Sequence, residues 1–482
     1  MTKTPVRVLE LNNIDIYGKR FNGSSLQEYI RKHPEYGIEI NFLVNHKLSA
    51  DKNIAKLFES ENLEIYDWKI EEIEQNLKIK NQISVAEEAL IKHPLYQQAD
   101  ILHFHMYHNM HLPIEFLTRI PKEKQIILDF HDTFWLTDDD IPMLEVFQFS
   151  DVNKSSLDTQ RKRVLNSIDA HFILHSPFMQ KIAQKSSVTK HLDVSLINFG
   201  IDSEIFKPLD QKSLREKYNI PQDNLVLLCR SQKEFKGTPY INEAIKKLRT
   251  TKSITVITVG AKNLLDKSAR YNLVELGSID DEKKMTEIYN LCDIFLAPST
   301  EESFGFMAIE AMSCEKPVIV FDGTALPYTV NAPKIGISTK RSSDELAKAI
   351  DSLANNPQEI IFRGQAGREY VLKNYTEQQY FNHYIALFQK LAKQQRNPLP
   401  TQAPDSPDQD TTKHFEAFLN QESETPELFD YNNPTIQNTL YKYNKKLYNE
   451  INKSTNPQNI KSLMKKLIPR KVKQYLKEKG LK

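Results

Sequence analysis

The feature that most constrains this chain is a repeated alternation of short, β-branched runs with longer amphipathic stretches. The apolar runs begin at Val6, Ile38, Asp100, Ile126, Ala170, Leu225, Ser253, Asp293 and Lys316. Between them the apolar residues recur at helical spacing, and the rhythm restarts after about residue 200. Such strand–helix alternation is typical of parallel sheets covered by helices on both faces. The pattern predicts an α/β protein with two doubly wound, Rossmann-like domains.

The restart and two changes in composition predict the domain boundaries. We expect a first domain over residues 1–197 and a second over 198–375, with a hinge in the segment NFGIDSEIFKP, which starts at Asn198. Residues 376–394 have the spacing of an amphipathic helix. Residues 395–440 are acidic and contain prolines, which is typical of an exposed linker. Residues 441–482 form a basic tail.

The overall composition excludes several classes of protein. Among 482 residues, 64 Lys and Arg nearly balance 63 Asp and Glu, which disfavours a nucleic-acid binder. The three cysteines, Cys229, Cys292 and Cys314, lie in apolar runs and predict a reducing, cytoplasmic location rather than a disulfide scaffold. The start of the chain lacks the layout of a signal peptide, and no run is long enough to span a membrane.

Ligands of open parallel sheets bind beyond the carboxyl ends of the strands, so the residues that follow each run are candidates for a site. Arg230 ends the run LVLLCR, and Lys236 and Gly237 follow before a predicted helix. Two cations beside a helix N-terminus can bind a phosphate or a diphosphate. The alternative is an ordinary solvated loop with surface cations.

A second candidate segment follows the run DIFLAPS. An acidic loop leads to Gly305, which is expected to open a helix that ends near Cys314. Glu302 and Glu310 stand eight residues apart in this segment, too far to share a proton as a carboxylate pair. They can instead contact two ends of one extended ligand. With only 13 glycines in the chain, a glycine at this helix start indicates close approach of a ligand to the backbone.

This segment resembles the E-x7-E signature of retaining GT-B glycosyltransferases in the large family 4-like group that makes bacterial polysaccharides and lipid glycans. Arg230, Lys236 and Gly237 are similar to the diphosphate site of that family, and NFGIDSEIFKP to its hinge. The segments DILHFHMYH and LDFHDTFWLT resemble N-domain segments of its colanic-acid or capsule type. The resemblance covers roughly residues 5–390.

The resemblance implies a role for each residue of the site. Arg230 and Lys236 would neutralise the diphosphate of a nucleotide-sugar donor, such as a UDP- or GDP-sugar, and would act in catalysis. Glu302 would bind the sugar hydroxyls, and Glu310 the ribose. The donor would also touch the starts of two predicted helices. These are Gly237 in one loop and Ser303, Phe304, Gly305 and Phe306 in the other. No metal and no other cofactor would be needed, and the anomeric configuration would be retained.

The first domain would bind the acceptor and contribute two further positions. The family places a histidine where His131 follows the run IILDF, near the reacting sugar; the alternative is a structural histidine bonded to Asp132. Gly23 matches the glycine-rich loop that contacts donor or acceptor. Two positions depart from the family, since Asn22 stands where a glycine is usual and Phe199 where an asparagine is usual.

Other motifs favour weaker hypotheses. The segment HFHMYHNMH contains His103, His105, His108 and His111, which could suggest a metal, but no carboxylate or cysteine of suitable spacing lies nearby in the sequence. We therefore expect no metal. Asp138, Asp139 and Asp140 resemble the metal motif of a different glycosyltransferase architecture and are better read as a solvated loop. No G-x-G-x-x-G follows the first run, which disfavours a nicotinamide-dependent oxidoreductase.

The end of the chain separates charge. Residues 401–430 hold eight acidic residues and one lysine, whereas 441–482 hold thirteen Lys and Arg against two glutamates. Residues 459–482 place apolar residues at helical spacing with lysines on the other face, a pattern that suits an anionic membrane surface. The alternatives are contact with the acidic stretch or with a partner protein.

Together these observations predict a cytoplasmic, peripherally membrane-associated retaining hexosyltransferase. Its acceptor would be a glycan or a lipid-linked sugar in bacterial surface polysaccharide or glycoconjugate synthesis. A rival hypothesis is a non-catalytic, transferase-like partner protein that binds glycan or lipid. A sugar phosphorylase of the same architecture would need a cofactor lysine, which we do not find in context.

Overall fold

The computed structural model describes residues 5–15, 23–57, 85–110, 112–137, 154–232 and 235–394. All of them belong to one of the two compact units into which the chain divides, the one formed by Met1–Glu59 and Ile83–Pro404. The predicted linker over 395–440, the basic tail over 441–482, Asn22, His111 and Asp138 to Asp140 lie outside the described residues.

The first sheet has seven strands in the order β3-β2-β1-β4-β5-β6-β7, and all of its pairings are parallel. The strands are β1 (Val6–Ile14), β2 (Ile38–His46), β3 (Ile54–Lys56), β4 (Ile101–His105), β5 (Gln125–Phe130), β6 (Ala170–Leu174) and β7 (Val194–Leu196). The α-helices between them are α1 (Ser24–Lys32), α3 (Val85–Lys92), α4 (Pro94–Gln98), α5 (Lys154–Ser167) and α6 (Pro177–Lys185). Short 3-10 helices are η1 (Pro34–Tyr36), η2 (Tyr107–Asn109) and η3 (Ile114–Thr118).

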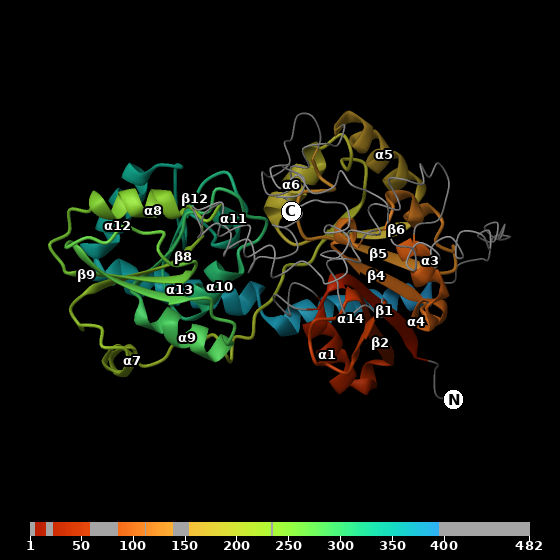
Figure 1. Ribbon diagram of the computed structural model, residues 1–482, viewed down its shortest axis with the longest axis horizontal. Coiled ribbons are helices and arrows are strands. Elements are labelled where there is room, and N and C mark those ends of the chain that lie inside the picture. The colour runs from red at the N-terminus through yellow and green to blue at the C-terminus, as the bar shows by residue number, and fades with distance from the viewer. Residues whose placement is uncertain are drawn as a thin grey trace, which may run out of the picture. The chain divides into compact units, whose positions relative to one another are not determined.

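The second sheet has six parallel strands in the order β10-β9-β8-β11-β12-β13. Its strands are β8 (Leu225–Ser231), β9 (Ile254–Gly260), β10 (Tyr271–Gly277), β11 (Ile294–Ala297), β12 (Val318–Phe321) and β13 (Ile337–Thr339). The helices that accompany it are α7 (Gln211–Lys217), α8 (Thr238–Lys246), α9 (Glu282–Leu291), α10 (Phe306–Ser313), α11 (Leu326–Thr329), α12 (Ser343–Ala354) and α13 (Pro357–Asn374). Figure 1 labels most of these elements around β8 and β9. The prediction of two doubly wound sheets is confirmed.

Helix α14 (Glu377–Lys393) returns the end of the described chain to the first sheet. Thr376 caps the helix through its side chain and forms a capping box with Gln379. The buried face of α14 contacts β1 and α1, and the Tyr384 hydroxyl donates a hydrogen bond of 2.6 Å to Asp129 near the end of β5. The helix thus brings a polar group from the end of the chain to the carboxyl end of the first sheet.

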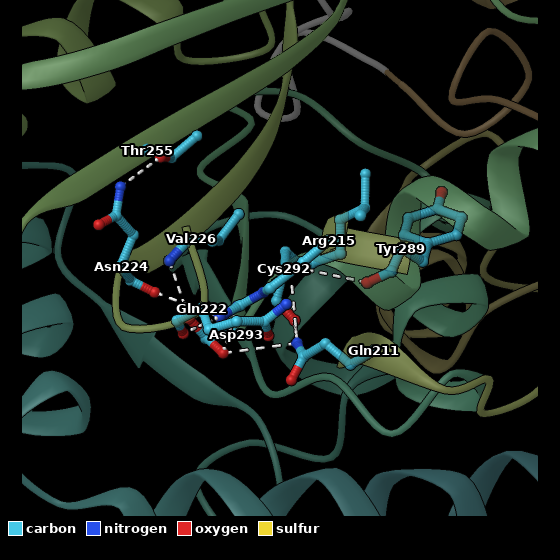
Figure 2. A network of polar contacts seen from close by, with 10 residues as sticks. Gln211, Arg215, Gln222, Asn224, Val226, Thr255, Tyr289, Cys292 and Asp293 are labelled. Carbon is cyan, nitrogen blue, oxygen red and sulfur yellow. Dashed lines mark hydrogen bonds and ion pairs between the residues drawn. The ribbon is translucent and has the colours of Figure 1, made fainter. Parts of the chain in front are cut away.

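The opposite, amino ends of the strands in the second sheet are held by a separate polar network (Figure 2). Asp293 accepts hydrogen bonds of 2.8 Å from the Arg215 guanidinium and from the backbone N–H of Val226. Arg215 also donates to the carbonyl of Leu291 and Gln211 to that of Cys292. Because this buried network joins α7 to the starts of β8 and β11, it is structural, and it lies at the edge away from the predicted site.

Candidate functional site

The residues expected to bind a diphosphate lie at the end of β8 and in the loop after it. One of the two strands beside β8 in the sheet is β11. Arg230 is the second-last residue of β8, and its side chain is exposed while the rest of the strand is buried. Lys236 and Gly237 precede α8. Because β8 and β11 run parallel, their carboxyl ends meet at one edge, and the loops that follow them lie together.

These two loops are held to each other by backbone and side-chain contacts. The N–H of Thr300 donates to the carbonyl of Phe235 at 2.8 Å. The ammonium of Lys236 lies 2.5 Å from a carboxylate oxygen of Glu302. Both side chains are mostly buried, at 15% and 20% exposure, so the ion pair is shielded from bulk water. Lys236 and Glu302 belong to motifs that are far apart in the sequence, and the fold brings these two residues together in one polar cluster.

Gly237 is required by the way the loops meet. Its φ is 73°, in the left-handed region, and a Cβ at this position would lie 2.0 Å from the carbonyl oxygen of Pro298. Only glycine satisfies both conditions. The close approach places the N-terminus of α8 against the segment that follows β11.

Gly305 plays the same part at the start of α10, with a φ of 103°. A Cβ there would lie 2.4 Å from a methyl carbon of Leu326 in α11. The same segment supports the loop by hydrogen bonds. The N–H of Ala325 donates to the backbone carbonyl of Glu302 at 3.0 Å, and the Thr329 hydroxyl donates to the backbone carbonyl of Phe304 at 2.6 Å. The loop that carries Glu302 is therefore fixed from behind by α11.

Glu310 is the fifth residue of α10, and its partner could not be predicted from the sequence. The hydroxyl of Tyr289 in α9 donates a hydrogen bond of 2.7 Å to the Glu310 carboxylate. Burial and the nearby carboxylate raise the pKa of Tyr289 well above its ordinary value, so the hydroxyl stays protonated and remains a donor. Arg341 is a second residue that sequence reasoning missed; its guanidinium donates to the carbonyl of Thr300 at 2.7 Å.

The predicted residues of the first sheet lie in a buried polar cluster at its carboxyl end. His131 follows β5, and its Nε2 lies 3.4 Å from Nδ1 of His105. Gly23, with a φ of 93°, covers the other side of His105, since a Cβ at position 23 would lie 2.5 Å from Nε2 of His105. His105, which we did not predict as a site residue from the sequence, thus lies between Gly23 and His131.

Asp129 and Glu10 complete this cluster, and sequence reasoning missed both. One oxygen of Asp129 lies 3.0 Å from Nε2 of His103 and 3.6 Å from Nε2 of both His131 and His175. These side chains are fully buried. Polar residues two positions apart on β4, and again at the end of β5, were a signal of this cluster in the sequence. The sequence could not show, however, that residues of these two strands contact each other.

Burial and neighbouring charges set the protonation of the cluster. Burial lowers the pKa of His131 to about 3 although Asp129 opposes the shift, so its imidazole is neutral at ordinary pH. Burial alone would raise the pKa of Asp129, but His103, together with hydrogen bonds from His131 and His175, outweighs that effect and holds the pKa well below its usual range. Asp129 is therefore an anion surrounded by imidazoles.

Phe199 links the two groups of predicted residues. Its ring stacks on His175 at 3.8 Å between centroids and meets the edge of His131 at 5.2 Å. On its other side it contacts Phe304 at 5.2 Å and Phe306 at 5.0 Å. In addition, the Ser176 hydroxyl donates to the carbonyl of Ser303 at 2.7 Å. Phe199, in the segment predicted as a hinge, therefore covers His131, whose side chain has no exposed surface.

The remaining histidine of the motif has its own partner. Nε2 of His108 lies 3.1 Å from Asp132, and its ring stacks on Phe134 at 4.4 Å. Asp132 is thus paired with His108, whereas the alternative from the sequence had Asp132 bonded to His131.

In the described part of the chain, no helix is long and apolar enough to cross a membrane.

The second sheet carries the similarity to a described family. Residues 210–369 match the family described as Glycosyl transferases group 1. D-inositol 3-phosphate glycosyltransferase of Mycobacteroides abscessus is 26% identical over 163 residues, which are 31% of this chain and 37% of that protein. Lipopolysaccharide 1,2-N-acetylglucosaminetransferase of Salmonella typhimurium is 29% identical over 169 residues, 31% of this chain and 44% of that protein. The chain spans less than half the length of these relatives.

Solved structures match a larger part of the chain. Sucrose-phosphate synthase from Thermosynechococcus elongatus has a TM-score of 0.60 at 17% identity and covers 81% of this chain and 99% of its own. HepE from Anabaena, solved in complex with UDP and glucose, has a TM-score of 0.58 at 16% identity and covers 81% of this chain and 100% of its own. Residues 210–369 thus match the Glycosyl transferases group 1 family, and the described part of the chain has the GT-B fold that we predicted.

Proposed function

We propose that this chain is a retaining hexosyltransferase that moves a sugar from a nucleoside diphosphate sugar to a glycan or lipid-linked acceptor. One observation carries the proposal: Lys236 and Glu302, from the loops after β8 and β11, form a shielded ion pair. Exposed Arg230 stands at the end of β8, the strand that precedes the Lys236 loop. Cations and a carboxylate at the ends of these strands match a ligand that combines an anionic diphosphate with sugar hydroxyls.

Each group has a chemical task in this reaction. As the glycosidic bond to the diphosphate breaks, negative charge grows on the leaving oxygens, and Arg230 and Lys236 stabilise it. The N-terminus of α10 adds the positive end of its helix dipole. These fixed charges do the work that a metal ion would do at the diphosphate. Glu302, released from Lys236 when the diphosphate takes its place, accepts hydrogen bonds from the sugar hydroxyls.

Glu310 binds the ribose of the donor in this proposal. Its carboxylate already accepts a hydrogen bond from Tyr289, which fixes its orientation. A pre-oriented acceptor loses less conformational entropy when the ligand binds. The nucleoside itself, as in a UDP- or GDP-sugar, is recognised outside these groups.

His131 acts near the acceptor in this proposal, together with the Gly23 loop. The ring of Phe199 covers His131, so the acceptor reaches the imidazole when that ring turns aside. A neutral imidazole suits this position, because it can exchange hydrogen bonds with a sugar hydroxyl without adding a charge.

The same proposal assigns the reaction to bacterial surface polysaccharide or glycoconjugate synthesis in the cytoplasm. Support comes from the relatives, one named for D-inositol 3-phosphate and one for lipopolysaccharide. Residues 459–482 would bind an anionic membrane surface, where a lipid-linked acceptor is found. Co-sedimentation of the full chain with vesicles of anionic or neutral lipids tests that part separately.

The decisive experiment measures nucleotide release from a panel of UDP- and GDP-sugars, with and without a lipid-linked sugar acceptor. The expected result is acceptor-dependent release from one donor, lost in Lys236→Ala. The matched control is Lys246→Ala, because Lys246 lies on the adjacent α8 and pairs with Asp266 on the surface. Loss of nucleotide release in both variants, or release that does not depend on the acceptor, contradicts the proposal.

A second candidate is a non-catalytic partner that binds glycan or lipid. The observation that favours it is the burial of His131 beneath Phe199, at the position where the family has an asparagine. Under this hypothesis the chain shifts its melting temperature with an acceptor glycan but releases no nucleotide from any donor.

A further inference from the structure

Three fully buried side chains on neighbouring strands converge in the first sheet, and the proposed transfer reaction uses none of them. They are Glu10 of β1 and His103 and His105 of β4. One ligand atom from each, a carboxylate oxygen or an imidazole nitrogen, lies within 4.8 Å of the other two. The group therefore has the size of a first coordination shell.

The pairing of β1 and β4 explains the convergence. Glu10 stands directly opposite His103 in the parallel register, and His105 is two residues further along the same strand. Residues two apart on a strand point to one face of the sheet, so all three side chains meet there. The sequence showed the two histidines, but only the register brings the carboxylate beside them.

The far nitrogens of both imidazoles face a second carboxylate. Nδ1 of His103 lies 3.0 Å from Glu10, and its Nε2 lies 3.0 Å from Asp129. In the same way, Nε2 of His105 contacts Glu10, and its Nδ1 lies 3.5 Å from Asp129. Histidines that bind metal ions usually turn their other nitrogen toward a carboxylate or carbonyl in this manner. Tyr384 holds Asp129 in place with its hydrogen bond.

Charge balance also favours a cation. Among the described contacts, Glu10 and Asp129 meet imidazoles and one phenol, and neither meets a lysine or an arginine. Two buried carboxylates are costly unless their charge is compensated. A protonated His103 between them offsets one charge, whereas one divalent cation with neutral imidazoles offsets both.

Gly23 approaches this group closely. A Cβ at position 23 would lie 2.5 Å from Nε2 of His105, the nitrogen that faces Glu10. The backbone at Gly23 is therefore packed against this imidazole, and any larger residue would displace it.

We propose that Glu10, His103 and His105 bind one divalent transition-metal ion, with Asp129 orienting both histidines. Two imidazoles and one carboxylate are a ligand set typical of zinc. The ion joins β1 to β4 beneath the Gly23 loop and takes no part in donor binding. Because the ligands are buried, it stabilises the first sheet rather than activating a substrate.

The test is elemental analysis of the full chain, produced without a histidine tag and dialysed against buffer that contains a trace of zinc. We expect about one zinc ion per chain. Glu10→Gln combined with His105→Asn should retain less than about one-tenth of it, because two of three ligands are lost. Removal of the metal with a strong chelator should lower the melting temperature of the wild-type chain by roughly 5 °C or more.

His175→Asn is the matched control, because His175 is equally buried and borders the same Asp129 oxygen but contributes no ligand atom. It should keep the wild-type zinc content. The alternative is a metal-free network in which a protonated His103 bridges Glu10 and Asp129. The proposal is overturned, and that alternative established, if the folded wild-type chain holds less than about one-tenth of a zinc ion per chain and the chelator does not change its melting temperature.

Discussion

The Nζ atom of Lys236 lies 2.5 Å from Oε2 of Glu302, although the two residues are 66 positions apart in the chain. This ion pair joins the loop after β8 to the loop after β11. It also gives each charge a partner. In the proposed reaction, a diphosphate replaces that partner for Lys236, and sugar hydroxyls replace it for Glu302.

The first prediction concerns Glu302→Gln, which keeps the shape of the side chain but removes its charge. We expect nucleotide release to fall by about 10² to 10³, since each lost charged contact in a transition state costs roughly that factor. Initial rates at saturating donor measure the loss. Glu243→Gln, on the surface of α8, serves as the control, and wild-type rates in Glu302→Gln would refute the site assignment.

The second prediction concerns the two glycines that shape the loops. Gly237→Ala places a Cβ 2.0 Å from a carbonyl oxygen, and Gly305→Ala places one 2.4 Å from Leu326, both at positive φ. Each should lower the free energy of unfolding by about 2–4 kcal/mol, measured by urea denaturation.

Gly37→Ala separates the contribution of backbone strain from that of the clash. Gly37 also has a positive φ of 67°, but nothing lies within 4 Å of the position of its Cβ. It should cost only about 1 kcal/mol. Equal losses in all three variants would show that the close contacts contribute nothing.

The third prediction concerns the hydroxyl of Tyr289. Tyr289→Phe removes the hydrogen bond to Glu310 and leaves that carboxylate less firmly oriented. We expect the KM for the donor to rise by about 5- to 10-fold, equivalent to about 1 kcal/mol, with little change in kcat. An unchanged KM with a reduced kcat would instead indicate that Glu310 acts in the chemical step.

The fourth prediction concerns the three cysteines. All are free and buried, and burial raises the pKa of Cys229 and Cys292 to about 12 and that of Cys314 further. Thiols alkylate as thiolates, so the native chain should react with iodoacetamide at pH 8 only over hours, and the denatured chain within minutes. Mass spectrometry of timed samples counts the modified residues; rapid labelling of the native chain would contradict the buried packing.

The central strands could be predicted from the sequence, whereas the edge strands could not. Runs such as LVLLCR and SITVITVG are buried on both faces and read as continuous apolar segments, and they form β8 and β9. The strands that escaped prediction, β3, β7, β10 and β13, are the edges of the two sheets. An edge strand is partly exposed, so its residues lack the apolar run that reveals a strand.

The sequence by itself determined the fold class, the order of the central strands, and the two motifs that contain Lys236 and Glu302. These features are local, because hydrophobic periodicity and glycine placement depend on neighbours within a few residues. The tertiary structure alone decided which side chains meet: Glu302 with Lys236, Tyr289 with Glu310, and Glu10 and Asp129 with the histidines of β4. Strand order and register set those pairings, and they depend on packing between segments that lie far apart in the chain.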